Sequence, residues 1–210
     1  MQFDVIIVGA GPAGIFSALE LSRNTDLNII MLDKGNDLEK RKCPASRGLG
    51  CINCEPCNLL SGWGGAGAFS DGKLTLSTSV GGWLNEYLSQ EELAKLLDYV
   101  DSIYVSFGGS STLHGTNMDE IERIERKASL AGLRLIKQRI RHLGTENCMN
   151  VLMKIRRELN SKVEIKVRTE VKSLIVKDRK IKGVKTADNE VIHGKYVIVA
   201  PGRSGAEWLK

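Results

Sequence analysis

The chain has 210 residues, of which 42% are hydrophobic and 26% are charged; these proportions are typical of a soluble chain with one large or two small domains. The formal net charge of +5 comes from 30 basic and 25 acidic residues spread along the chain, which gives no clustered basic surface for nucleic acid. Near the N-terminus, Asp4 stands where a signal peptide carries basic residues, and glycines interrupt the apolar run before it could span a bilayer. We therefore expect a cytoplasmic protein with no nucleic-acid or membrane partner.

The first motif is a strand that ends in a glycine-rich turn. Residues 5–8 form an unbroken β-branched run, which favours a strand buried on both faces of a parallel sheet. The turn has the spacing Gly-x-Gly-x-x-Gly, in which the first glycine permits the sharp turn, the second admits a pyrophosphate and the third lets the next helix lie close. The residues of this turn are Gly9, Ala10, Gly11, Pro12, Ala13 and Gly14.

A helix and a second strand follow this turn. Apolar residues at helical spacing predict a helix that ends near residues 24–26. A second apolar run, residues 27–32, ends in Asp33, whose carboxylate can accept hydrogen bonds from ribose hydroxyls. The order of strand, glycine turn, helix, strand and acid predicts a dinucleotide site, and the alternative is a tight turn in an ordinary α/β domain.

Residues 43–73 are rich in cysteine and glycine. Four of the five cysteines are Cys43, Cys51, Cys54 and Cys57, and without a secretion signal they are thiols or ligands rather than a disulfide framework. Their spacing suits a zinc ion or an iron–sulfur cluster, but redox thiols and inert cysteines remain alternatives, and we assign no metal. The five glycines at 62–72 predict backbone that turns sharply or lies against a flat or charged ligand.

Helices predominate in the middle of the chain. Ser89 and Glu92 form a capping box, a second helix begins at Asn117, and a third follows residues 145–147. The expected inner face of the second helix is Ile121, Ile124, Ala128 and Ala131. Residues 133–143 alternate between basic and apolar side chains and predict an exposed strand.

The last fifty residues change to a period of two. Short strands at 163–167, 171–176, 180–186 and 190–193 predict a β-meander, and a buried strand from Tyr196 leads into a second glycine turn. The opening and closing strands then share one parallel sheet. We therefore expect residues 1–74 and 161–210 to form an α/β domain, with residues 75–160 as a mainly helical insertion.

These motifs resemble a known family. The glycine turn with Asp33, the meander and residues 197–202 together resemble the FAD-binding domain of the glutathione-reductase-like flavoproteins, over nearly the whole chain. Residues 51–73 and 141–145 resemble the uncharacterised FAD-dependent dehydrogenases of bacteria and archaea within that superfamily. Such proteins usually continue well past the second glycine turn, so we expect this chain to be the N-terminal part of a longer flavoprotein.

The resemblance implies a Rossmann-like fold with FAD as cofactor. Gly9, Gly11 and Gly14 would hold the pyrophosphate, Asp33 the adenosine ribose, and the loop 62–67 would lie near the isoalloxazine ring. Val171 would meet the adenine through its backbone. The resemblance implies cofactor contacts also at Ala10, Pro12, Ala13, Lys34, Gly64, Gly65, Ala200, Pro201 and Gly202.

The implied function is that of an FAD-dependent oxidoreductase, a dehydrogenase acting on an unidentified small molecule, with NAD(P)H or another electron carrier as a further partner. We assign no catalytic residue, because the cofactor itself carries the electrons. His142, beside Arg141, and Lys73 are candidates that a solvated or structural role explains as well. The alternative is a non-catalytic flavin-binding electron-transfer module or an inactive fragment.

Overall fold

The structure, a computed structural model, describes residues 2–206, 208 and 209. The chain divides into two compact units, which we call the sheet unit (Met1–Phe69 with Leu152–Lys210) and the insert unit (Ser70–Val151). The second boundary lies at residue 151 rather than 160, because the C-terminal half of helix α4 (Thr145–Leu159) belongs to the sheet unit. There the buried Trp63 donates a hydrogen bond from Nε1 to the Leu152 carbonyl over 3.0 Å.

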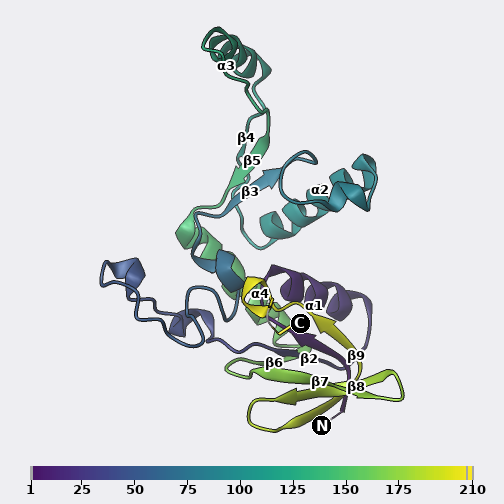
Figure 1. The fold of residues 1–210 in the computed structure, drawn as a ribbon. Helices are drawn as coiled ribbons and strands as arrows, with labels where there is room; N and C mark the ends of the chain where they lie inside the picture. Colours follow the sequence, from purple (N-terminus) through teal and green to yellow (C-terminus); the bar gives the residue numbers. More distant parts are fainter. Residues whose placement is uncertain (1, 207, 210) are drawn as a thin grey trace. The chain divides into compact units, whose positions relative to one another are not determined.

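The sheet unit is built on a six-stranded sheet with the order β6-β2-β1-β9-β8-β7 (Figure 1). Its strands are β1 (Gln2–Val8), β2 (Ile29–Leu32), β6 (Val163–Lys166), β7 (Val171–Lys177), β8 (Lys180–Thr186) and β9 (Val191–Val199). Strands β6, β2, β1 and β9 are parallel, whereas β7, β8 and β9 are linked by antiparallel pairs. This confirms the predicted α/β class, a Rossmann-like parallel sheet with a β-meander.

Two strands differ from the sequence prediction. Strand β6 is not part of the meander, because it follows α4 and pairs in parallel with β2 at the opposite edge, with Val163 opposite Ile29. Strand β9 is one continuous strand rather than two. Its start pairs antiparallel with β8, and residues 193–199 run parallel to β1, so Gly194 lies inside the strand, opposite Phe3.

The core of the sheet unit lies on both faces of β1 and β2. One face is a buried cluster shared with the meander: Phe3, Ile6, Val8, Ile30, Leu32, Val171, Val184 and Ile192. Helix α1 (Pro12–Asn24) packs on the other face and buries Ile15, Ala18, Leu19 and Ser22, which are spaced along one side of the helix. A Cβ at Gly14 would lie 1.9 Å from the Gly9 carbonyl oxygen and 3.3 Å from the Ile7 side chain. The helix can therefore lie this close to β1 only with glycine at position 14.

The insert unit has a small antiparallel sheet with the order β3-β5-β4. Its elements are β3 (Lys73–Leu76), α2 (Gln90–Ser106), β4 (Leu113–His114), α3 (Met118–Leu130) and β5 (Arg139–His142). The capping box at Ser89 is present, but only residues 139–142 of the predicted strand 133–143 form a strand. Across both units, the described residues also form short 3-10 helices at Leu38–Lys40, Ala45–Arg47, Gly65–Phe69, Leu84–Glu86 and Arg203–Gly205.

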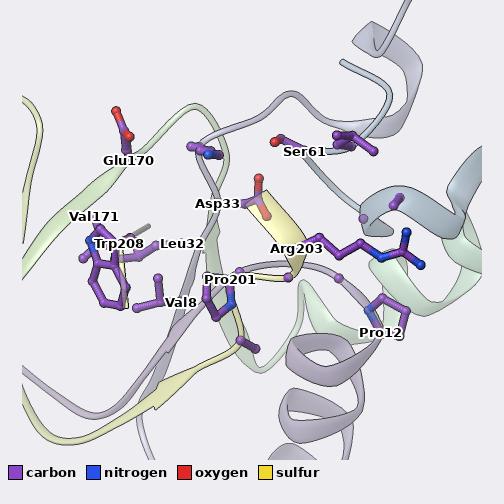
Figure 2. A pocket seen from close by; sticks show the side chains of 18 of the residues that line it. Val8, Pro12, Leu32, Asp33, Ser61, Glu170, Val171, Pro201, Arg203 and Trp208 are labelled. Carbon is purple, nitrogen blue, oxygen red and sulfur yellow. The ribbon is translucent and has the colours of Figure 1, made fainter. Parts of the chain in front are cut away.

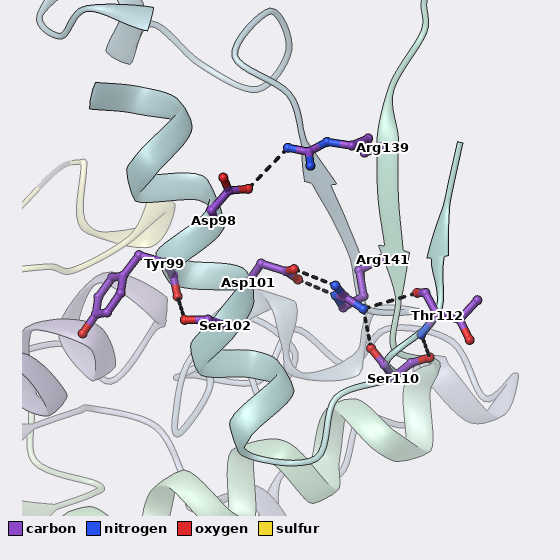
Figure 3. Close-up of polar contacts among 8 residues, drawn as sticks. All are labelled: Asp98, Tyr99, Asp101, Ser102, Ser110, Thr112, Arg139 and Arg141. Carbon is purple, nitrogen blue, oxygen red and sulfur yellow. Dashed lines mark hydrogen bonds and ion pairs between the residues drawn. The ribbon is translucent and has the colours of Figure 1, made fainter. Parts of the chain in front are cut away.

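An ion pair between Arg141 and Asp101 joins β5 to α2 inside the insert unit (Figure 3). The Arg141 guanidinium donates to both carboxylate oxygens of Asp101, one over 2.7 Å, and to the Ser110 carbonyl over 2.7 Å. Hydrogen bonding to Asp101 also raises the pKa of Arg141. Both ends of this pair are largely shielded from solvent, so removing either partner would leave a shielded charge unpaired.

Helix α3 departs from its predicted packing. The stripe of apolar residues expected on its inner face is not buried, and Ile124 is 43% exposed. The periodicity therefore predicted the helix correctly but not a packing partner for it within the described residues.

Over the same described residues, the structure contains no helix that is both long and apolar enough to cross a bilayer.

Gly14→Ala should destabilise the sheet unit, because its Cβ would overlap the Gly9 carbonyl. We expect the free energy of unfolding to fall by about 1–3 kcal/mol, as for other overpacked sites, when the flavin-free protein is unfolded in urea. Gly11→Ala is the matched control, because its Cβ would lie 3.8 Å from the nearest heavy atom, the Gly65 Cα. Equal urea midpoints for the two variants would contradict the packing of α1 described above.

Candidate functional site

A pocket of about 350 Å³ lies where the carboxyl ends of β1, β2 and β9 meet the N-terminus of α1 (Figure 2). Its wall comes entirely from the sheet unit. In an open parallel sheet, ligands bind at the carboxyl ends of the strands, at the point where the strand order changes direction. In this sheet that point is at β1, which has β2 on one side and β9 on the other. The pocket is therefore the first candidate for a cofactor site.

Ten of the fourteen residues expected to bind the cofactor line this pocket. They are Gly9, Gly11, Pro12, Asp33, Lys34, Gly65, Val171, Ala200, Pro201 and Gly202. The other four do not line it. Ala10 and Gly14 are buried in the turn, Ala13 is exposed on α1, and a Cβ at Gly64 would lie 2.7 Å from the Leu152 side chain.

The first glycine turn offers an open backbone surface to a ligand. Gly9 has a φ of +105°, and a Cβ there would lie 2.1 Å from the Ala200 carbonyl oxygen, so this glycine is required by the fold. Gly11 has no such neighbour, and a side chain at this position would project into free space beside the pocket. Within the described chain, α1 has no side-chain cap and no acid in its first turn. Its free N–H groups and its dipole favour an anion at this point.

Asp33 holds the turn together as well as lining the pocket. Its Oδ2 accepts a hydrogen bond from the Ala10 N–H over 2.8 Å, and its Oδ1 accepts one from the Gly35 N–H over 2.7 Å. Each carboxylate oxygen can accept more than one hydrogen bond, so both retain capacity for a ligand hydroxyl. The ligand role of Asp33 stays a prediction, and its link to the glycine turn was not predicted from the sequence.

The opposite end of the pocket is an apolar slot. Figure 2 shows the indole of Trp208 beside Val8, Leu32 and Val171. The Trp208 Nε1 donates to the Lys172 carbonyl over 2.8 Å, which fixes the ring plane. A flat heteroaromatic group suits such a slot, because aromatic rings bury a large apolar area against neighbours of this kind.

Several lining residues were not predicted as site residues from the sequence. They are Val8, Leu32, Leu60, Ser61, Ala66, Gly67, Thr169, Glu170, Arg203 and Trp208. Val8 and Leu32 could have been found, because each is the last residue of a strand that points at the glycine turn. Ala66 and Gly67 lie in the loop that was expected near the cofactor. Trp208 carries no local signal, because its contacts with the β1 and β2 side chains are remote in sequence.

Arg41 organises the loop that closes one side of the pocket. Its side chain is buried and donates to three carbonyls, those of Asn58, Leu59 and Trp63, over 2.7–2.9 Å. The guanidinium also lies over the Phe69 ring, 4.9 Å from its centre. Burial lowers the pKa of Arg41, while the nearby Asp33 and Cys57 oppose that shift.

The four clustered cysteines line a separate groove of about 830 Å³ that shares Lys34, Ser61 and Glu170 with the first pocket. All the cysteines are free thiols. Among the described residues, no three Cys, His, Asp or Glu side chains are placed so that they could hold one metal ion. The arrangement therefore offers no direct support for the zinc or cluster alternative.

The weak catalytic candidates lie in the insert unit. Lys73 and His142 are opposite each other in the β3–β5 pair, both are exposed, and Lys73 forms an ion pair with Asp71 over 2.8 Å. Arg141 is engaged by Asp101. The ion pairs of Lys73 and Arg141 are contacts within the insert unit, and a catalytic role for Lys73 or His142 stays a prediction.

Comparison with known proteins decides the class of ligand. The family described as FAD binding domain matches residues 2–207 of this chain. The chain belongs to this family. FAD is therefore the cofactor of the domain, and the open glycine turn, Asp33 and the apolar slot are the kinds of contact that its adenosine diphosphate half requires.

A relative at the sequence level is an uncharacterized protein of Clostridium beijerinckii, 47% identical over 72 residues, which is 33% of this chain and 13% of the relative. Three solved structures share the fold at 14–15% identity: L-amino acid deaminase from Proteus vulgaris (TM-score 0.52), 3-ketosteroid-delta4-(5alpha)-dehydrogenase from Rhodococcus jostii (0.54) and glycine oxidase from Bacillus cereus (0.52). In the same order, the matches cover 96%, 94% and 98% of this chain. They cover 47%, 45% and 56% of the three solved chains. The chain thus spans about half the length of these structures.

Arg41→Ala should loosen the pocket loop, because three carbonyls would lose a charged donor at a buried site. We expect a loss of roughly 2–4 kcal/mol in the free energy of unfolding and faster amide exchange in residues 58–69. Hydrogen exchange followed by mass spectrometry measures both local and global opening. Lys40→Ala removes an exposed neighbouring cation and should leave exchange unchanged. Unchanged exchange in Arg41→Ala would show that the loop does not depend on this side chain.

Proposed function

We propose that this protein is an FAD-dependent oxidoreductase, a dehydrogenase that acts on a small molecule and exchanges electrons with NAD(P)H or another carrier. The observation that carries the proposal is the pocket at the carboxyl ends of β1, β2 and β9 in a chain of the FAD-binding family. Its lining combines an anion site, a carboxylate and an apolar slot in the order in which a dinucleotide presents diphosphate, ribose and adenine.

The diphosphate would lie on the first turn of α1. Gly11 leaves its side of the backbone open, and no side chain of the described residues caps the N–H groups at the start of α1. These donors are fixed before the ligand arrives, because Gly9 is wedged against Ala200 and Ala10 is bonded to Asp33. A preorganised set of donors binds an anion without a large ordering cost.

The adenosine would lie between Asp33 and the apolar slot. The Asp33 oxygens can each accept a further hydrogen bond, which suits the two ribose hydroxyls. The slot formed by Val8, Leu32, Val171 and Trp208 would take the adenine ring. In this placement Lys34 and Glu170 flank the ribose at the rim of the pocket.

The residues 65–67 extend from the same pocket and are candidates for contact with the flavin half. A Cβ at Gly67 would meet no atom within 4 Å, so this backbone, like that of Gly11, is open on one side. Bound FAD supplies reversible two-electron redox chemistry, and the residues of this chain bind and orient it. No side chain of the sheet unit is assigned to proton transfer.

The proposal is tested with the purified protein. We expect it to contain flavin, or to take up added FAD, and we expect a reducing small molecule to bleach the flavin absorbance anaerobically. Amino acids, hydroxy acids and reduced nicotinamide nucleotides form a first panel. Failure to bind FAD would refute the cofactor placement. A flavin that is reduced only by a redox protein and by no small molecule would instead favour an electron-transfer module.

Gly11→Val should abolish FAD binding without unfolding the chain, because the added side chain would occupy the space assigned to the diphosphate. Gly11→Ala should weaken binding about tenfold, or about 1.4 kcal/mol. Equilibrium titration of flavin-stripped protein measures affinity, and circular dichroism checks the fold. Ala131→Val adds bulk at an exposed position of the insert unit, outside the pocket, and should retain wild-type affinity. Full FAD affinity in Gly11→Val would show that the turn serves only the fold.

A further inference from the structure

Arg203 stands at the edge of the cofactor pocket, directly after the second glycine turn. It lines the same pocket as Gly11 and Pro12, and Figure 2 shows its side chain extending along the wall where Pro12 lies. The guanidinium is exposed, and within the described residues it has no hydrogen bond or ion pair. A cation at this point is available to a ligand.

Other arginines of the sheet unit show what a structural arginine looks like here. Arg41 is bonded to three carbonyls, Arg23 pairs with Glu158 over 2.8 Å, and Arg156 pairs with Asp37 over 3.1 Å. Arg203 makes none of these contacts with described residues, although it points along the pocket wall. A role in holding the fold therefore does not account for it.

The backbone that carries Arg203 is held in place. Gly202 has a φ of +65°, which favours glycine, and its carbonyl accepts a hydrogen bond from the Gly205 N–H over 3.1 Å. A Cβ at Gly205 would lie 2.3 Å from the Pro201 ring, so the short helix 203–205 packs directly on Pro201. The guanidinium thus projects from a fixed turn rather than from a loose end.

The charge balance around this wall favours an anion. The N-terminus of α1 contributes partial positive charge and no acidic side chain in its first turn, and Asp33 already accepts two backbone N–H bonds. Arg203 adds a full positive charge with a planar set of donors. Such a fork matches two phosphate oxygens better than a hydroxyl or a carbonyl.

We propose that Arg203 is a positioning residue that binds the diphosphate of FAD beside the N-terminus of α1. The inference rests on the proposed placement of FAD in this pocket. It makes Arg203 a specificity determinant as well, because the guanidinium favours ligands that carry a diphosphate over those that carry only adenosine. The second glycine turn then has a defined task, which is to present this side chain.

The test compares three ligands on flavin-stripped protein: FAD, ADP and adenosine, the last two by competition with FAD. Arg203→Ala should weaken FAD and ADP by the same factor, at least tenfold, and should leave adenosine affinity unchanged. Arg203→Lys keeps the charge but not the fork and should fall between wild type and alanine. Arg157→Ala removes an exposed arginine of α4 outside the pocket and serves as the matched control.

The salt dependence supplies a second readout. Arg203→Ala should make ADP binding less sensitive to salt concentration than it is in the wild-type protein, because one contact with a phosphate is lost. The salt dependence of adenosine binding should not change. Equal weakening of ADP and adenosine, or wild-type affinity for FAD in Arg203→Ala, would overturn the inference while leaving the FAD site intact. If the wild-type protein binds no FAD, the placement of the cofactor itself fails, and the inference fails with it.

Discussion

The close contact between the two glycine turns is the constraint on which the rest of this structure depends. A Cβ at Gly9 would lie 2.1 Å from the Ala200 carbonyl oxygen, so the end of β1 and the end of β9 meet with no side chain between them. Parallel pairing of Val8 with Val199 brings the two turns to the same edge of the sheet. The candidate cofactor pocket is the space left beside this contact, and residues of both turns line it.

Two polar side chains preserve the shape of that space. Asp33 ties the first turn to the end of β2 through the Ala10 N–H, and Arg41 ties the loop that includes Leu60 and Ser61 to the chain that precedes the cysteines. Both are charged and turned inward, so each contributes hydrogen bonds to backbone groups that would otherwise be unsatisfied. A ligand therefore meets donors and acceptors whose positions are already fixed.

The local motifs could be predicted from the sequence, and the long-range pairings could not. The turn from Gly9 to Gly14 and the position of Asp33 could be predicted from short stretches of sequence. The glycines are required by the backbone of the turn, and the acid directly follows a predicted strand. Strand β6 was assigned to the wrong neighbour, because alternating polarity predicts a strand but not its partner or direction. The apolar stripe of α3 likewise predicted a buried face that the described residues do not cover.

The same distinction applies to the site. Arg41 and Trp208 act through contacts that are distant in sequence, with loop carbonyls and with the β1 and β2 side chains, so no spacing rule identifies them. Arg203 follows a recognisable glycine turn, yet only the structure shows that it lines the same pocket as the first glycine turn. Cysteine spacing suggested a metal site, and the described thiols are not arranged to form one.

The most direct test of the central claim is amide hydrogen exchange on flavin-stripped protein with and without FAD. Binding in the described pocket predicts slower exchange in residues 10–14, 33–35, 61–67, 169–171 and 202–203. Exchange in α3, whose residues form no part of the pocket, should stay unchanged. Protection that is absent from the two glycine turns, or that is confined to the insert unit, would contradict this account of where the cofactor binds.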